Sequence, residues 1–421
     1  MNKVKIKGIR VENFLKSAKK SSKIVASLKP KTKSKILLQM ADHIEKNCDF
    51  IIKENAKDIE YGRKNDLSYA LLDRLLLDKK RVSSMANSIR EIASLREPVG
   101  RVLDGWVIPN GLRIEKVSVP IGVIGIIYES RPNVTSDTAA LCFKSGNVCV
   151  LKGGKEAKNS NQAIATLLQE ILKKNSLPTQ IISLLPDNSR EGVAKLIKMD
   201  KYVDLIIPRG GESLIKYISK NSTVPVVKHD KGLCHIFIDE SAQIKSSLAI
   251  SINAKCQRTG VCNALETLLV HKNIAKEILP LLKVKFDEQK TKLLGCEKTQ
   301  EIIDVELASQ EDFYTEYLDN ILSIKVVENL EEAIEHIDIY GSGHSDSILT
   351  QDYTNAEKFL DEVDSACVYV NSSTRFTDGG EFGFGAEVGI STNKLHARGP
   401  MGINDLTTYK FKIYGNGNIR E

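Results

Sequence analysis

From residue 123 onward, short apolar segments alternate with longer amphipathic ones, and this alternation restricts the possible folds more than any other feature of the sequence. The apolar segments predict strands at residues 123–127, 148–151, 181–185, 203–207 and 224–227. Helical patterns separate them, including one that follows Asn133 and one that begins beyond Ser160. This order indicates an α/β fold with a parallel sheet covered on both faces. Ligands of such folds gather at the carboxyl ends of the strands.

A second block with the same alternation begins near Cys234 and extends to about Asp364. It contains predicted strands at residues 265–270 and 321–327 and a helix from about Asn273. The chain has 421 residues, which exceeds the length at which a single hydrophobic core stops growing. The two blocks therefore predict at least two domains.

Outside these blocks the pattern changes. Residues 11–95 are predicted to be helical, because apolar side chains such as Val11, Leu15 and Ala18 recur on one face. Residues 106–118 resemble two short strands around a Pro-Asn-Gly turn. The tail at residues 406–414 has a strand pattern and is expected to pair with this hairpin. A hairpin that stands apart from a helical region is often an assembly arm.

Composition and charge exclude several classes of protein. The chain is 42% hydrophobic and 27% charged, as is ordinary for a globular protein, with no apolar run long enough to cross a bilayer and no secretory signal. The formal net charge of +6 lies largely in Lys-rich helical stretches near the start. A solvated helix face explains it better than a nucleic-acid site, because no aromatic platform or nucleic-acid-binding motif accompanies the lysines.

The cysteines and histidines give no support for a metal site. The eight cysteines form no Cys-x-x-Cys pair, and the seven histidines show no metal-ligand spacing. His344 lies in a polar loop, where a histidine is more often structural than a catalytic base. A chain of this length needs no disulfides, so free thiols in a reducing cytosol are expected.

One cysteine has the setting of a nucleophile. Cys262 follows a glycine-containing loop and precedes an apolar strand or helix start. Backbone N–H groups together with Lys255 or Arg258 would lower the pKa of a thiol at this position. Cys256 shares the loop and is the rival nucleophile, and the physical argument does not choose between the two.

Glycines follow two of the predicted strands. Gly210 and Gly211 come after the strand at residues 203–207 and before a helix, where paired glycines can hold a phosphate or form a simple tight turn. Two lysines, Lys152 and Lys155, flank another glycine pair after residue 151. The glycine-dense stretch at residues 379–389 matches no phosphate motif and is interpreted as a packed loop.

Four segments of the chain, taken in order, resemble the aldehyde dehydrogenase superfamily and specifically its γ-glutamyl phosphate reductase branch. They are Tyr-Glu-Ser-Arg-Pro-Asn-Val-Thr at residues 128–135, Gln-Arg-Thr-Gly-Val-Cys-Asn-Ala-Leu-Glu-Thr at 257–267, residues 327–348, and residues 374–383 continuing through 396–402. The resemblance covers essentially the whole chain, and four segments in register are far more specific than any single glycine motif.

The resemblance implies roles for several residues. Cys262 is the expected nucleophile, because the family cysteine precedes Asn-Ala-x-Glu-Thr. Asn133 is expected to donate its side-chain amide to the developing oxyanion, with the backbone N–H of Cys262 as second donor. Cofactor contacts are expected from Lys152, from the Gly210–Gly211 turn and, as the ribose-binding glutamate, from Glu316.

Two departures from the pattern of related enzymes bear on cofactor preference and on the activation of water. Relatives that prefer NAD often carry Glu three residues after the Lys152 position, whereas this chain has Lys155, which can pair with a 2′-phosphate; NADPH is therefore expected. Hydrolytic relatives have a Glu-Leu-Gly-Gly motif whose Glu activates water. The matching residues 228–235 contain no Glu, although His229 and Asp230 lie there.

The activity implied by the resemblance is NADPH-dependent reduction of L-glutamyl 5-phosphate to L-glutamate 5-semialdehyde and phosphate through a cysteine thioester, the second step of proline biosynthesis from glutamate. Arg258 is expected to face the leaving phosphate, and Arg131 and Arg375 to hold the α-carboxylate. A separate glutamate 5-kinase must supply the acyl phosphate. A cytoplasmic homo-oligomer is expected, with no metal, nucleic acid or membrane.

The expected domain limits follow from the same resemblance. Residues 1–105 and 120–233, with part of 365–400, form a Rossmann-type cofactor-binding domain, and residues 234–364 form an α/β catalytic domain that carries the nucleophile. Residues 106–119 and 401–421 form a small β oligomerisation arm. The rival interpretations are an NAD-dependent aldehyde oxidiser, disfavoured by the missing Glu and by Lys155, and a basic nucleic-acid-binding protein, which leaves the Cys262 loop unexplained.

Overall fold

The computed structural model describes residues 2–227 and 231–420, which form two compact units. The first unit comprises Met1–Lys228, Gly383–Gly389 and Met401–Glu421, and the second comprises His229–Phe382 and Ile390–Pro400. The second unit extends beyond residue 364, where the second block was expected to end, because strand β13 (Cys367–Val370) belongs to its sheet.

The first unit contains a four-stranded parallel sheet in the order β5-β4-β3-β6. Its strands are β3 (Val123–Tyr128), β4 (Val148–Lys152), β5 (Ile182–Leu184) and β6 (Leu205–Arg209). Every residue of β3 is buried, as expected for a central strand covered on both faces. Four of the five strands predicted in this block are thus confirmed.

The fifth predicted strand, at residues 224–227, is wrong. Only Val226 forms a bridge there, to Ile206. The carbonyl of Pro225 accepts from the Ile206 N–H at 2.8 Å, and the Val227 N–H donates to the Ile206 carbonyl at 3.0 Å. Because proline has no N–H to donate, the segment cannot extend this pairing as a regular strand would.

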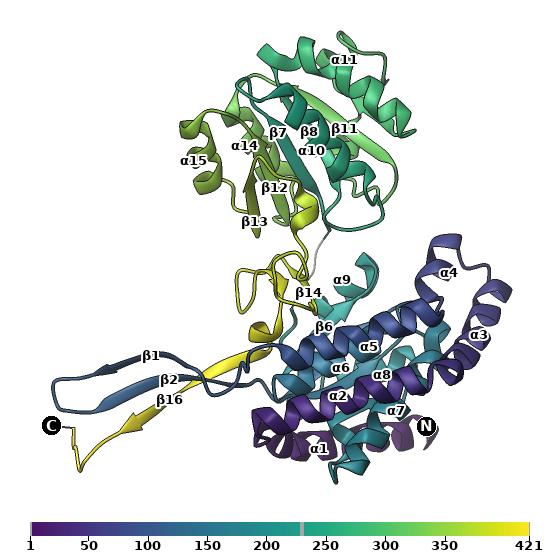
Figure 1. The fold of residues 1–421 in the computed structure, drawn as a ribbon, viewed down its shortest axis with the longest axis vertical. Coiled ribbons are helices and arrows are strands. Elements are labelled where there is room, and N and C mark those ends of the chain that lie inside the picture. Colours follow the sequence, from purple (N-terminus) through teal and green to yellow (C-terminus); the bar gives the residue numbers. More distant parts are fainter. Residues whose placement is uncertain (1, 228–230, 421) are drawn as a thin grey trace. The chain divides into compact units, whose positions relative to one another are not determined.

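Helices cover the sheet of the first unit, as Figure 1 shows. Helices α6 and α7 pack on the strands, and α2, α3 and α5 form a further layer on α6 and α7, whereas α1 packs against β3, β4 and α8. The predicted apolar stripe is confirmed, since Val11, Leu15 and Ala18 have no exposed surface. The helices are α1 (Asn2–Ala26), α2 (Pro30–Lys46), α3 (Cys48–Lys64), α4 (Tyr69–Leu75), α5 (Lys79–Ser94), α6 (Asn133–Lys144), α7 (Lys158–Lys174), α8 (Arg190–Leu196) and α9 (Glu212–Asn221).

A separate three-stranded antiparallel sheet forms an arm in the first unit, as predicted from the hairpin and the tail. Strands β1 (Val102–Val107) and β2 (Arg113–Pro120) form the hairpin. Strand β16 (Thr407–Tyr414) pairs with β2 along its whole length. Gly111 has a φ of 86° and donates its N–H to the Ile108 carbonyl, so the turn depends on a backbone conformation that glycine adopts easily.

The second unit contains a seven-stranded parallel sheet in the order β10-β9-β11-β8-β7-β12-β13. The predicted strands at residues 265–270 and 321–327 are confirmed as β8 and β11. Besides β13, its strands are β7 (Cys234–Ile238), β8 (Leu265–His271), β9 (Lys292–Gly295), β10 (Glu306–Leu307), β11 (Ile321–Val327) and β12 (Ser345–Leu349). A further pair, β14 (Gly389–Ser391) and β15 (Gly399–Met401), forms a two-stranded sheet.

Alternate residues of the central strands enter two hydrophobic cores, one on each face of this sheet. Ile236 and Ile238 lie in one core with residues of α10 and α11, whereas Phe237 between them lies in the other core with residues of α14 and α15. The helices of the second unit are α10 (Ile244–Cys256), α11 (Lys272–Glu288), α12 (Glu297–Gln300), α13 (Gln310–Phe313), α14 (Leu330–Tyr340) and α15 (Tyr353–Glu362). The predicted fold class, α/β with parallel sheets covered on both faces, is therefore confirmed.

Among the described residues, no helix is both long and apolar enough to span a membrane. All eight cysteines are free thiols.

Candidate active site

Cys262 lies in the turn between α10 and β8 and is partly exposed. Its carbonyl oxygen accepts a hydrogen bond from the Cys234 Sγ at 3.2 Å. Gly232 packs directly against the same backbone, because a Cβ atom at Gly232 would lie 2.0 Å from the Cys262 carbonyl oxygen. The backbone that carries the candidate nucleophile is thus held by a thiol and packed against a position where a side chain would collide with it.

The residue after Cys262 connects this turn to the segment that follows β13. The side-chain Nδ2 of Asn263 donates to the carbonyl oxygens of Arg375 and Thr377, at 3.3 and 2.9 Å. The Thr374 hydroxyl donates to the Asn263 carbonyl at 2.8 Å. These bonds hold the Arg375 segment beside Cys262.

Two guanidinium groups therefore lie in the region of the thiol. Arg375 donates from Nε to the Gln257 Oε1 at 2.9 Å, and its side chain is partly buried. Burial lowers the pKa of Arg375, and the positive charge of the exposed Arg258 lowers it further, whereas Asp378 and the Cys262 sulfur act in the opposite direction. The structure thus brings three residues predicted from the sequence, Cys262, Arg258 and Arg375, into one electrostatic neighbourhood.

The rival cysteine has a different environment. Cys256 packs against the apolar core of the second unit, with its Sγ 3.4 Å from the Thr291 hydroxyl. Burial raises the pKa of the Cys256 thiol, which disfavours the thiolate that a nucleophile requires. The environments of the two cysteines therefore favour Cys262.

Lys255 does not take the place expected for it near the thiolate. Its side chain is fully buried, and its Nζ lies 2.7 Å from the Glu266 Oε2. Burial raises the pKa of Glu266 to about 7, while Lys255 lowers it. A buried ammonium is retained only when it is paired, so Lys255 stabilises the Glu266 carboxylate.

Glu316 also lies beside the Cys262 turn. Its Oε1 accepts from the Gly232 N–H at 2.9 Å, and this is the glycine that packs against Cys262. The structure thus places the residue expected to bind a ribose in the second unit, close to the candidate nucleophile.

The residues around Cys262 lie at the amino ends of the strands of the second unit. The general expectation for such folds was that sites lie at the carboxyl ends. Cys234 begins β7, Cys262 precedes β8, and Glu316 precedes β11. His344 precedes β12 and is buried, with its Nδ1 2.9 Å from the Ser345 hydroxyl and 3.6 Å from the Cys234 Sγ. This burial supports the structural interpretation of His344.

In the first unit, the predicted cofactor residues do lie at carboxyl ends. Strands β4 and β6 flank β3, so the loops that follow these three strands meet at one edge of the sheet. The Gly211 N–H, just before α9, donates to the Glu129 Oε2 at 2.9 Å. A Cβ atom at Gly210 would lie 2.6 Å from the same carboxylate oxygen. This turn therefore already binds an anionic oxygen through its backbone.

The lysines of this edge differ from each other. Lys152 ends β4 and is partly buried, and burial lowers its pKa, although Glu156 and Glu129 act in the opposite direction. Lys155 begins the short helical turn Lys155–Ala157 and is exposed. The structure thus gives Lys155 the accessibility that contact with a ligand requires.

Asn133 and Arg131 lie in the loop after β3 and at the start of α6. Asn133 is exposed, and its Nδ2 donates to the Asp137 Oδ2 at 3.0 Å. The Arg131 carbonyl accepts from the Val134 N–H at 3.1 Å, as a residue at a helix start does. The structure therefore groups Asn133, Arg131, Lys152, Gly210 and Gly211 at one edge of the first unit.

Three neighbours of the site were not identified from the sequence. Gly232 and Cys234 contact Cys262 but are distant from it in the sequence, so no local sequence pattern identifies them. Asp137 was detectable, because a helix was predicted to follow Asn133 and residues four apart lie on one helix face. His229 and Asp230 lie outside the described residues.

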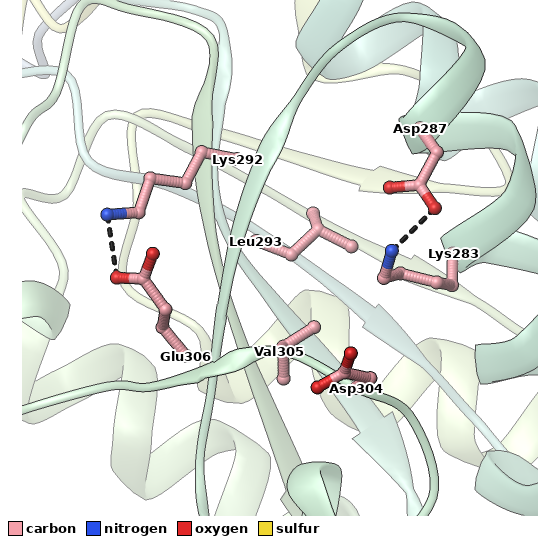
Figure 2. A pocket seen from close by; sticks show the side chains of 7 residues that line it. All are labelled: Lys283, Asp287, Lys292, Leu293, Asp304, Val305 and Glu306. Carbon is pink, nitrogen blue, oxygen red and sulfur yellow. Dashed lines mark hydrogen bonds and ion pairs between the residues drawn. The ribbon is translucent and has the colours of Figure 1, made fainter.

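A pocket of about 340 Å³ lies elsewhere, at the β9–β10 edge of the second unit. Figure 2 shows its charged lining, in which Lys292 pairs with Glu306 and Lys283 with Asp287. None of the predicted site residues lines it.

Comparisons with known proteins agree with the fold and with the order of the motifs. The model of the aldehyde dehydrogenase family matches residues 5–299 and 307–411. The chain is 68% identical to the γ-glutamyl phosphate reductase of a Nitratiruptor species, over 98% of this chain and 100% of that protein. It is 66% identical to the protein of the same name from Nautilia profundicola, with the same coverage.

A solved structure gives a similar result. The crystal structure of γ-glutamyl phosphate reductase from Thermotoga maritima has a TM-score of 0.96 and 47% identity, covering 98% of this chain and 100% of that one. The resemblance inferred from four sequence segments is thus confirmed. The chain belongs to the aldehyde dehydrogenase family.

Proposed function

We propose that this protein reduces L-glutamyl 5-phosphate to L-glutamate 5-semialdehyde, with release of phosphate and consumption of NADPH, as the second step of proline biosynthesis. The observation that carries the proposal is the partly exposed Cys262, beside Arg258 and Arg375, in a chain 68% identical over its length to a γ-glutamyl phosphate reductase. An acyl phosphate is an anionic electrophile, and a thiol with guanidinium groups in its neighbourhood suits it.

Cys262 acts as the nucleophile. Its thiolate attacks the γ-carbonyl carbon, the bond to the phosphate oxygen breaks, and the glutamyl group is held as a thioester. NADPH, when bound, supplies the hydride that reduces this thioester. The resulting thiohemiacetal expels the Cys262 thiolate, and the semialdehyde leaves and cyclises to pyrroline-5-carboxylate.

The oxyanion that forms during attack needs donors in place. The side-chain amide of Asn133 and the backbone N–H of Cys262 serve as these donors. The support for Cys262 in this role is the constraint on its backbone by Gly232 and by the Cys234 thiol. The support for Asn133 is its exposed position at the start of α6.

The arginines bind the anionic ends of the substrate. Arg258 faces the leaving phosphate, and Arg375 and Arg131 hold the α-carboxylate. The hydrogen bond from the Arg375 Nε to Gln257 orients its guanidinium group, whose planar set of N–H donors matches a carboxylate.

Five residues bind the cofactor. Lys152, Gly210 and Gly211 contact its phosphates, Glu316 its ribose, and Lys155 the 2′-phosphate. The fit is supported by the Gly211 N–H, which binds a carboxylate oxygen of Glu129 as it would a phosphate oxygen. Lys155 is exposed and carries a positive charge, which suits binding of a phosphate group. An ammonium group cannot accept a hydrogen bond from a ribose hydroxyl.

The setting of the reaction completes the proposal. No glutamate lies at residues 228–235 to activate water, so the thioester is preserved for reduction. The exposed apolar side chains of the arm, including Trp106, Val107, Phe411 and Ile413, favour assembly into a homo-oligomer. A separate glutamate 5-kinase supplies the substrate in the cytoplasm, where the eight thiols stay reduced.

The test is an assay of the reverse reaction with glutamate semialdehyde, phosphate and either NADP⁺ or NAD⁺. We expect reduction of NADP⁺ that requires phosphate. Cys262→Ala should abolish this activity while far-UV circular dichroism and thermal unfolding stay unchanged, and the matched variant Cys256→Ala should keep it. Turnover without phosphate, full activity in Cys262→Ala, or loss in Cys256→Ala instead, would overturn the proposal.

A further inference from the structure

Asp137 lies one helical turn after Asn133 on α6. Asn133 is the first residue of this helix, and residues four positions apart lie on the same face. The Asn133 Nδ2 donates to the Asp137 Oδ2 at 3.0 Å. The amide therefore has a fixed partner within its own helix.

The environment of Asp137 keeps its carboxyl group in place. The Ser88 hydroxyl of α5 donates to this carboxyl group. The Ser136 hydroxyl makes its shorter bond, 2.9 Å, to the Asn133 carbonyl and lies 3.4 Å from the Asp137 Oδ1. The positive charge of Arg209, at the end of β6, also acts on it. Burial raises the pKa of Asp137 to about 6, while the three side-chain hydrogen bonds and Arg209 lower it. The group is thus mostly ionised at neutral pH and above.

An ionised carboxylate can only accept hydrogen bonds, so it selects one orientation of the amide. The NH₂ group of Asn133 must face Asp137, because the amide oxygen would be repelled there. An NH₂ group has two hydrogens, and Asp137 takes one of them. The second hydrogen points away from the carboxylate and is left for another acceptor.

We propose that Asp137 is a positioning residue for the reaction, which holds the Asn133 amide so that its second N–H is presented to the oxyanion. This inference rests on the proposed function, in which Asn133 is an oxyanion donor. If Asp137 were absent, the amide could rotate by half a turn and present its oxygen to the developing negative charge. Preorganisation of the donor, rather than its presence alone, is what lowers the barrier.

The test is a double-mutant cycle on the kinetics of the reverse reaction. We expect Asn133→Ala to lower kcat by roughly 10²–10³-fold, as loss of an oxyanion donor does. Asp137→Ala should lower kcat by about 10-fold, a part of that loss, with KM for the semialdehyde and for NADP⁺ unchanged. In the double variant Asn133→Ala/Asp137→Ala, no further loss should occur beyond that of Asn133→Ala.

Two further variants separate positioning from folding. Asp137→Asn retains an acceptor for the Asn133 amide, so its kcat should lie between those of Asp137→Ala and the parent. Thr138→Val is the matched control on the same helix, because the Thr138 hydroxyl donates only to the Val134 carbonyl among the bonds described, and its kcat should match the parent. If Asp137→Ala does not fold, Asp137→Asn takes its place in the cycle.

The outcomes distinguish this inference from the proposed function. Full kcat in Asn133→Ala would remove the oxyanion assignment and the inference with it. A loss in Asn133→Ala, with parental kcat in Asp137→Ala or with losses that multiply in the double variant, would overturn the inference alone. A rise in KM without a fall in kcat for Asp137→Ala would overturn it as well.

Discussion

The two parallel sheets of this protein carry their candidate site residues at opposite ends of their strands. In the first unit, the loops that contain Asn133, Lys152 and Gly211 follow the carboxyl ends of β3, β4 and β6. In the second unit, Cys262 and Cys234 lie at the amino ends of β8 and β7. One type of architecture thus supports two different placements of a site.

The source of positive potential differs between the two edges. At the carboxyl edge a helix begins after the strand, and backbone N–H groups such as that of Gly211 bind an anionic oxygen. At the amino edge no such helix start faces Cys262 in the bonds described, and side chains such as Arg375 and Arg258 supply the charge. A bound phosphate group suits the first edge, and a reactive thiolate suits the second.

The largest effect is expected from a substitution at the amino edge of the second unit's sheet. Gly232→Ala would place a Cβ atom 2.0 Å from the Cys262 carbonyl oxygen, so the turn must shift. We expect kcat to fall on the order of 10²-fold, as a displacement of about 1 Å in an active site can cause. The matched control is Gly105→Ala in the arm, where the nearest atom, the Ile114 carbonyl oxygen, is 3.4 Å away. Parental kcat in Gly232→Ala would show that the packing against Cys262 is unimportant.

A smaller effect is expected at the carboxyl edge. Lys155→Ala removes the charge proposed to bind the 2′-phosphate, and KM for NADPH should rise about 10-fold while KM for NADH stays the same. Lys158→Ala, at the exposed first residue of α7, is the control and should change neither value. Equal changes for both cofactors in Lys155→Ala would contradict the assignment.

The smallest expected effect concerns stability and compares the units directly. Burial lowers the pKa of His336, in the second unit, from 6.5 to about 2. As pH falls, His336 is therefore protonated in the unfolded chain before it is protonated in the folded protein. The stability that His336 contributes is present above pH 6.5 and is lost as pH falls below this value. Asp137, in the first unit, has a pKa raised to about 6, so its contribution has the opposite sign and is lost as pH rises.

Denaturant unfolding at about pH 7 and about pH 5.5 measures this difference. From the His336 shift alone, the second unit should lose about 1 kcal/mol of stability between the two values. The phenyl group of His336→Phe cannot be protonated. The variant should therefore lack the part of the stability loss that comes from His336. An identical pH dependence in the parent and in His336→Phe would contradict the expected role of His336.

Much of the fold was predictable because hydrophobic periodicity is a local property. The strands at residues 123–127 and 265–270 are confirmed, as is the pairing of the tail with the hairpin. The strand at residues 224–227 was predicted from apolar composition, although Pro225 removes the N–H that a ladder requires.

The candidate site was less predictable, because its contacts join distant residues. Cys262 and Arg375 could be named from motifs, but the hydrogen bonds of Asn263 that bring them together cross between two segments far apart in the chain. Lys255 was expected near the thiolate and is buried with Glu266 instead. Helical periodicity did not reveal this, because Glu266 lies on a strand and not on the helix of Lys255.

The pairing of β16 with β2 has a consequence for biosynthesis. The hairpin of β1 and β2 leaves the ribosome before its third strand, which is made about 290 residues later. At roughly 5–20 residues per second, the hairpin waits for about 15–60 seconds. A two-stranded ribbon is marginally stable in water, so the arm is completed only after β16 has been made. Contacts that require the finished arm therefore cannot form on a nascent chain before β16 has emerged.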